Sequence, residues 1–142
     1  MENFAKLADS LADRFGARII ISGAKKDVKL AANIKSLMKV TPIIIAGKTT
    51  LKELGALFTR ANLVVANDSG PMHMAVSMKA RTIALFGPTS PAMTGPYGEG
   101  VYIVLTGKTD CNVPCYDFTC TDNKCMASIK VDDVMREAEK ML

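Results

Sequence analysis

The chain has 142 residues, of which 49% are hydrophobic and 23% are charged, and its formal net charge is +4. This length suits a single domain with a real core, and the composition excludes general disorder. The basic residues are scattered and tryptophan is absent, so no nucleic-acid-binding surface is indicated. No apolar run approaches the roughly 20 residues that span a bilayer, and the amino terminus has no signal-peptide pattern. We therefore expect a cytoplasmic protein without a transmembrane segment, whose charge suits an anionic ligand or the anionic inner face of a membrane.

Helical and extended patterns alternate along the chain. Apolar residues at helical spacing predict helices over residues 3–15, 27–39, 51–58, 71–78 and 131–142. Short apolar runs predict strands over residues 17–22, 42–46, 63–66, 82–86 and 101–105. Gly16 stands where the first helix should end, and Thr49 or Thr50 should cap the third, with Glu53 completing a capping box. Residues 87–100 are rich in Gly and Pro and predict a loop, and the cysteine segment that follows the last strand is irregular.

The predicted strands are continuously apolar and alternate with helices, which is typical of a parallel sheet covered on both faces. We expect one doubly wound α/β domain over residues 1–142, with no internal boundary. Ligands of such folds bind beyond the carboxyl ends of the strands. The turns that fall at this edge begin at Gly23, Gly47, Asp68 and Gly87.

The turn between the strand at residues 63–66 and the following helix carries the chemistry of an anion site. A helix start has unpaired amides and about half a positive charge, so a phosphate bound there satisfies both. Pro71 suits the first helical position, and Gly70 lets a ligand approach the backbone. Ser69 can cap the helix or bond a phosphate oxygen, and His73 lies within reach of the same anion. Ordinary helix capping and a structural histidine remain alternatives at this stage.

Several motifs in order along the chain resemble the carboxyl-terminal half of glycosyltransferase family 9, the heptosyltransferases of lipopolysaccharide core assembly. The motifs are Asp68-Ser69-Gly70-Pro71-Met72-His73-Met74-Ala75, Phe86-Gly87-Pro88-Thr89, Gly95-Pro96-Tyr97-Gly98 and the segment from Cys111 to Met126. The resemblance implies a Rossmann-like domain that forms the carboxyl-terminal half of a GT-B fold. It also implies that the chain binds a nucleotide sugar, ADP-heptose, as the donor for an inverting transfer to a lipopolysaccharide core or similar glycan, with no required cofactor.

The same resemblance implies roles for individual residues. Asp68, Ser69, Gly70 and His73 correspond to the donor-binding turn, where the amides of Ser69 and Gly70 face the diphosphate and His73 lies beside it. Thr89 lies next to this phosphate site. For the nucleoside, Thr49 falls near the position that lines the adenine pocket and Asp27 is a candidate acceptor for ribose hydroxyls, although Thr49 could equally be a helix cap and Asp27 a solvated helix start.

The chain departs from the family pattern at its amino terminus. Family members begin this half with a further strand, a phosphate-binding turn containing Thr or Ser and a Lys, and a Trp-Pro helix entry, which the present sequence lacks. The catalytic base is expected in an amino-terminal acceptor domain. We therefore expect a fragment or one of two chains, and no transfer by this polypeptide alone.

Four cysteines lie close together, at Cys111, Cys115, Cys120 and Cys125. Four thiols can bind zinc or an iron–sulfur cluster, but this spacing differs from the usual two-residue knuckles. We expect no metal, with a tetrathiolate site as the alternative. Two rival functions also stay open: another GT-B enzyme, such as a sugar-nucleotide epimerase or a transferase that uses a UDP- or GDP-sugar, and a non-catalytic nucleotide-binding module.

Overall fold

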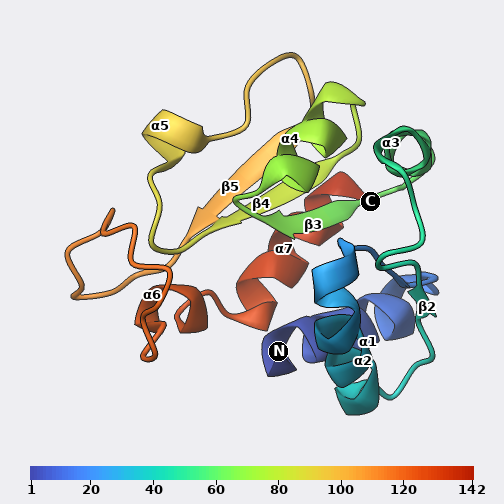
Figure 1. The fold of residues 1–142 in the computed structure, drawn as a ribbon, viewed down its shortest axis with the longest axis horizontal. Coiled ribbons are helices and arrows are strands. Elements are labelled where there is room, and N and C mark those ends of the chain that lie inside the picture. The colour runs from blue at the N-terminus through green and yellow to red at the C-terminus, as the bar shows by residue number, and fades with distance from the viewer. The chain divides into compact units, whose positions relative to one another are not determined.

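The computed structural model describes all 142 residues. They divide into two compact units, Met1–Leu54 and Gly55–Leu142. Each unit combines helices with its own parallel sheet, so the α/β class predicted from the sequence is confirmed (Figure 1). The strands form one sheet of two and one of three rather than the single continuous sheet that we expected.

The first unit contains two helices and a short sheet. Its elements are α1 (Glu2–Phe15), β1 (Ile20–Ile21), the 3-10 helix η1 (Lys25–Asp27), α2 (Val28–Leu37) and β2 (Ile43–Ile44). The helices α1 and α2 pack together, and β1 runs parallel to β2. Gly16 ends α1 in the left-handed conformation, with φ 62°, as its position predicted. The Asp9 carboxylate accepts hydrogen bonds from the amides of Lys39 (2.9 Å) and Val40 (3.0 Å), which fixes the chain that leaves α2.

Helix α3 (Leu51–Phe58) begins with a reciprocal cap. The Thr50 amide donates to Glu53 Oε2 at 2.7 Å, and the Glu53 amide donates to Thr50 Oγ1 at 3.3 Å. The structure thus selects Thr50, and not Thr49, as the cap. These bonds from the amide and the hydroxyl of Thr50 favour the ionised carboxylate and lower the pKa of Glu53.

The second unit is built on a three-stranded parallel sheet in the order β3-β4-β5. Its elements are β3 (Val64–Asn67), α4 (Gly70–Ser77), β4 (Thr82–Phe86), α5 (Pro91–Thr94), β5 (Tyr102–Thr106), α6 (Lys124–Ala127) and α7 (Val131–Met141). The central strand β4 has the predicted bounds. Its neighbours pair in register with it, Asn67 opposite Leu85 and Phe86 opposite Thr106.

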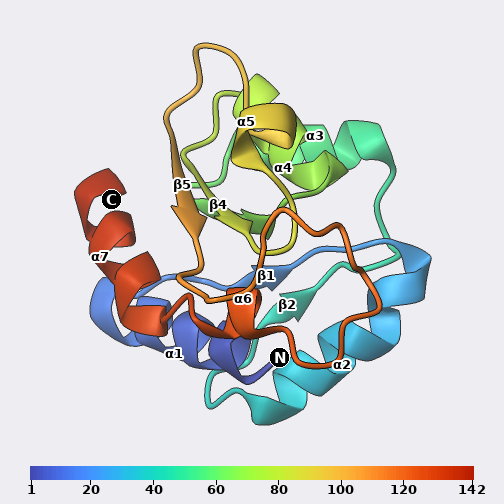
Figure 2. The same cartoon turned by 90° about the vertical axis from the view of Figure 1, so that its left-hand side faces the viewer.

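Helices cover both faces of this sheet. Helix α4 packs against β3 and β4, and α6 and α7 pack against β4. Figure 2 shows α4 and α7 on opposite sides of the strands β4 and β5. All five residues of β4 are buried, as expected for the middle strand of a covered parallel sheet. Met72 of α4 lies with Ala84 and Phe86 in one apolar cluster, which fixes the start of α4 on the sheet.

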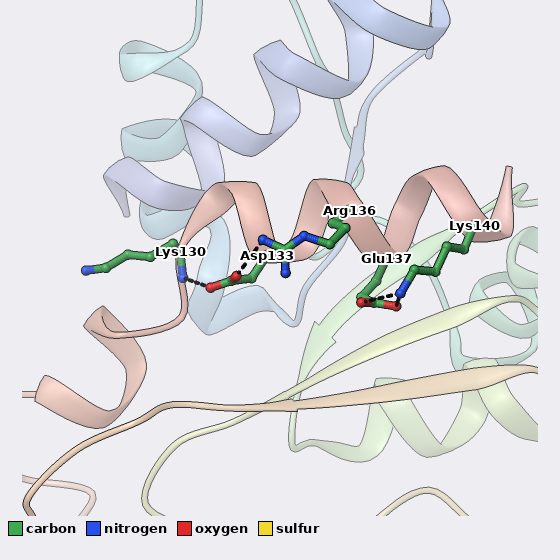
Figure 3. Close-up of polar contacts among 5 residues, drawn as sticks. All are labelled: Lys130, Asp133, Arg136, Glu137 and Lys140. Atoms are coloured by element: carbon green, nitrogen blue, oxygen red, sulfur yellow. Dashed lines mark hydrogen bonds and ion pairs between the residues drawn. The ribbon is translucent and has the colours of Figure 1, made fainter.

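Helix α7 is amphipathic. Its buried residues are Val134, Met135, Ala138 and Met141. Its polar side carries short-range pairs: Asp133 accepts from the Lys130 amide at 3.3 Å and from Arg136 at 3.2 Å, and Lys140 pairs with Glu137 at 2.8 Å (Figure 3). Exposed pairs of this kind contribute at most about 1 kcal/mol each to the stability of the fold, so α7 is held on the sheet mainly by its apolar side.

Three predictions about local structure were wrong. Residues 124–127 form helix α6 inside the cysteine segment that we expected to be irregular. Strands β1 and β2 are two residues long, shorter than the apolar runs that predicted them. Residues 91–94 form helix α5 inside the segment that we expected to be loop. None of the helices combines the length and the apolar character that crossing a bilayer requires.

Candidate anion-binding site

The turn after β3, residues 68–70, leads directly into α4. Ser69 occupies the position before the helix with an extended backbone, φ −168° and ψ 164°. Its hydroxyl donates to the Asn67 carbonyl at 2.9 Å and makes no bond to α4. Of the two roles left open for Ser69, helix capping is therefore not observed, because the hydroxyl oxygen accepts no hydrogen bond from an amide of α4. The Ser69 carbonyl instead accepts from the amides of Met72 (3.1 Å) and His73 (3.4 Å).

The start of α4 is open to a ligand. The amides of Ser69 and Gly70 donate to no backbone acceptor, and Pro71 has no N–H. Gly70 is exposed, and nothing lies within 4 Å of the place where a Cβ would stand. His73 is also exposed, in the first turn of the helix. The positive end of α4 therefore carries two amides without a backbone acceptor, next to the unobstructed space at Gly70.

Asp68 is held from two directions. Its amide donates to the Leu85 carbonyl of β4 at 3.1 Å, and its Oδ2 accepts a hydrogen bond from the hydroxyl of Thr94 at 2.8 Å. Thr94 is the last residue of α5, and the sequence interpretation did not include it. Pro91, which follows Ser90 at the first helical position, is the signal that could have predicted this short helix.

Thr89 lies in the turn after β4, the strand next to β3. Its hydroxyl is buried and has no hydrogen-bond partner in the chain. A buried hydroxyl without a partner costs free energy, so in native structures such a group generally has a ligand or water to bind. Gly87 begins this turn, where a Cβ would lie only 2.6 Å from the Met126 side chain, so the backbone approaches α6 closely.

The cysteine segment is attached to this same turn. The Pro88 carbonyl accepts hydrogen bonds from the amides of Cys115 and Tyr116, both at 3.0 Å. All four cysteines are free thiols: Cys125 is buried, Cys120 is half-buried, and Cys111 and Cys115 are exposed. No group of three or more His, Cys, Asp or Glu side chains is arranged to hold a metal ion, so the structure does not support the tetrathiolate alternative.

The two nucleoside candidates lie in the first unit. Asp27 Oδ2 accepts a hydrogen bond from the Ala24 amide at 2.9 Å, which closes η1 and occupies one carboxylate oxygen with a structural bond. Thr49 is half-buried and immediately precedes the cap Thr50. Their roles in nucleoside binding stay predictions.

A parallel α/β sheet with an open helix start at the carboxyl end of a strand defines a Rossmann-like domain, and that helix start is its candidate anion site. Residues 1–126 match the family model described as glycosyltransferase family 9 (heptosyltransferase). The chain belongs to this family.

The relatives are bacterial heptosyltransferases. Lipooligosaccharide heptosyltransferase 2 of Campylobacter jejuni is 32% identical over 98% of this chain and 44% of that protein. Lipopolysaccharide heptosyltransferase 3 of Escherichia coli K12 is 30% identical over 99% of this chain and 41% of that protein. The chain therefore spans less than half the length of these relatives.

Solved structures agree on the fold. A glycosyltransferase of family 9 from Veillonella parvula superposes with a TM-score of 0.84 at 31% identity, over 99% of this chain and 40% of that one. The E. coli heptosyltransferase WaaC with ADP superposes with a TM-score of 0.77 at 21% identity, over 99% of this chain and 39% of that one. The predicted fold class, a Rossmann-like α/β domain of the GT-B type, is confirmed.

Proposed function

We propose that residues 1–142 form the donor-binding part of an inverting glycosyltransferase, and that the open start of α4 binds the diphosphate of a nucleotide sugar. The observation that carries this proposal is the pair of amides at Ser69 and Gly70, which have no backbone acceptor and lie at the positive end of α4, next to the open space at Gly70. Because the relatives are heptosyltransferases, ADP-heptose is the donor that we propose and a lipopolysaccharide core the acceptor.

The charges at the turn indicate that different residues bind the diphosphate and the sugar of the donor. A diphosphate is anionic and carries no proton to donate at neutral pH, so the carboxylate of Asp68 repels it. Asp68 is therefore proposed to accept hydrogen bonds from hydroxyl groups of the sugar. The groups that can donate to the diphosphate are the two amides, His73 and the unpaired hydroxyl of Thr89.

In the proposed reaction, an acceptor hydroxyl attacks the anomeric carbon and the bond from that carbon to the diphosphate oxygen breaks. The role of this chain is to stabilise the charge that develops on the leaving diphosphate. Donors already aimed at the charge need no reorganisation, and the loss of one such donor typically costs on the order of 3 kcal/mol in the barrier. Negative charge would thus be met by the helix start and His73, with no metal ion required.

The proposed reaction needs an acceptor domain and a base that removes the proton of the acceptor hydroxyl. Since the chain covers 44% of its C. jejuni relative, we assign both to the part of the enzyme that corresponds to the remaining length. From the proposed substrates we infer that the enzyme works in the cytoplasm at the inner face of the membrane, and the net charge of +4 suits such an anionic surface.

Thermal unfolding with ADP, UDP or GDP tests this function. A ligand that binds only the folded state at about a hundred times its Kd stabilises by about 2.7 kcal/mol. We expect ADP to raise the melting temperature most. A larger shift with UDP or GDP would favour another GT-B enzyme, and no shift with any of them would contradict nucleotide binding. Nucleotide binding without transfer, even when an amino-terminal half is supplied, would favour a non-catalytic module.

A further inference from the structure

The hydrogen bond between Thr94 and Asp68 joins residues 26 positions apart, and both side chains are half-buried. The Thr94 hydroxyl also lies 3.2 Å from the Ser90 carbonyl, four residues earlier. The bond to Asp68 is shorter, at 2.8 Å, and its acceptor is charged. A hydrogen bond to an ionised acceptor is about twice as strong as one between neutral groups, so the carboxylate is the preferred partner.

The helix that carries Thr94 is held on two sides. The Gly95 amide closes the end of α5 on the Pro91 carbonyl at 2.9 Å, and a Cβ at Gly95 would collide with that carbonyl. On its other flank, the Tyr116 hydroxyl donates to Met93 Sδ at 3.3 Å. Because the backbone around Thr94 is constrained, its hydroxyl is held in one position relative to the Asp68 carboxylate.

Fixing Oδ2 of Asp68 leaves Oδ1 without a protein partner. The backbone of Asp68 is fixed as well, by its bond to Leu85. A carboxylate held at both its backbone and one oxygen presents the other oxygen in one direction, and this preorganisation lowers the entropy lost when a hydroxyl binds. Neither Thr94 nor Asp68 carries a positive charge that could attract the phosphates.

We propose that Thr94 is a positioning residue that aims the Asp68 carboxylate at the sugar of the donor, and so allows the site to distinguish a nucleotide sugar from the bare nucleotide. This inference rests on the proposed function. Thr94 itself touches neither phosphate nor sugar in this scheme. Its contribution appears as the extra affinity for ADP-heptose over ADP.

Calorimetric titration of the full chain with ADP and with ADP-heptose measures that contribution. Thr94→Val keeps the shape of the side chain and removes the hydroxyl, whereas Thr94→Ser keeps the hydroxyl. A matched control is Thr59→Val, because the Thr59 hydroxyl also bonds back to its own helix, to the Ala56 carbonyl at 2.8 Å, but reaches no carboxylate. Asp68→Asn, alone and combined with Thr94→Val, measures the coupling of the pair.

We expect Thr94→Val to weaken ADP-heptose binding by about tenfold, because the Asp68 carboxylate is then no longer preorganised for the sugar, and to leave ADP binding within about threefold of wild type. Thr94→Ser should restore the preference, Thr59→Val should not alter it, and Thr94→Val should add little in the Asp68→Asn background. The positioning role would be overturned if Thr94→Val kept the wild-type preference for ADP-heptose over ADP. It would also be overturned if Thr94→Val and Thr94→Ser each lost the same affinity for ADP as for ADP-heptose. Either result would leave the proposed function intact. Failure of the wild-type chain to bind ADP or ADP-heptose would overturn both.

Discussion

The amide of Asp68 donates to the Leu85 carbonyl at 3.1 Å, so the β3–β4 ladder extends one residue beyond the end of β3. Asp68, the first residue of the turn at residues 68–70, is thereby attached to β4, whose five residues are all buried. At its other end the turn enters α4, whose Met72 is fully buried against β4. The turn at residues 68–70 is thus fixed at both ends before any ligand arrives, which suits a site that stabilises developing charge.

Replacing Asp68 with Asn removes the negative charge and keeps the size of the side chain. We expect ADP to bind at least as tightly as to wild type, because the repulsion between carboxylate and diphosphate is gone. ADP-heptose should bind about tenfold more weakly, because a neutral amide oxygen is a poorer acceptor for a sugar hydroxyl. Calorimetric titrations with both ligands check this. A large loss of ADP affinity would show instead that Asp68 serves the nucleotide.

Gly70→Ala tests whether the open space beside the helix start is used. No atom lies within 4 Å of the new methyl group, and Gly70 has no positive φ, so the free energy of unfolding should change by no more than about 1 kcal/mol. The methyl group would stand beside the free amides, and ADP affinity should fall by about tenfold or more.

The control for this substitution is Gly16→Ala. Gly16 has φ 62°, where an added Cβ costs about 1–2 kcal/mol, so this variant should lose stability and keep its ADP affinity. Denaturant unfolding and calorimetry measure the two properties separately. A Gly70→Ala protein that binds ADP as wild type does would argue against phosphate at this position.

His73→Ala tests the proposed side-chain donor. The residue is exposed, so the variant should fold with wild-type stability. Loss of a hydrogen bond to a charged phosphate typically costs about 1.5–3 kcal/mol, which corresponds to about a 10- to 150-fold loss of ADP affinity. Ser77→Ala, at the far end of α4, should leave ADP binding unchanged, since its hydroxyl bonds only to the Met74 carbonyl. Equal affinities in the two variants would remove His73 from the site.

The reciprocal cap of α3 predicts a pH effect. The bonds from Thr50 hold the pKa of Glu53 below its ordinary value in the folded chain, so their stabilisation is complete at neutral pH and is lost as the pH falls through that lowered pKa. In Thr50→Val, the pKa of Glu53 should rise toward its ordinary value, as measured by NMR of the side-chain carboxyl carbon. Thr49→Val should leave it unchanged. An identical titration of Glu53 in the two variants would contradict the cap.

Features encoded by a few neighbouring residues could be predicted from the sequence. The start of α4 follows from Pro71 and the apolar strand before it, the end of α1 from Gly16, and β4 from its continuous apolar run. The ends of β1 and β2 could not, because a ladder depends on its partner as much as on its own residues. The partners of the Ser69 hydroxyl were also open, because a serine before a helix can donate to a neighbouring carbonyl, accept from a helix amide, or do both.

The contact between Thr94 and Asp68 could not be predicted from the sequence for a different reason. It depends on the path of the 25 residues between them, including a four-residue helix inside a Gly- and Pro-rich segment. Composition describes such a segment as loop, and only the Pro91 position indicated otherwise. The turn at residues 68–70 is local and its position before α4 was predictable, whereas its contact with Thr94 was not.

The most direct measurement is an NMR titration of the isotope-labelled chain with ADP. Binding of a diphosphate at the start of α4 predicts progressive, saturable shifts of the backbone amide signals of Ser69, Gly70 and His73. The amides of Glu137 and Lys140 on the polar side of α7 should not move. If the amide signals of Ser69, Gly70 and His73 do not shift even at a large excess of ADP, the start of α4 does not bind the nucleotide. The proposed role in glycosyl transfer is then wrong.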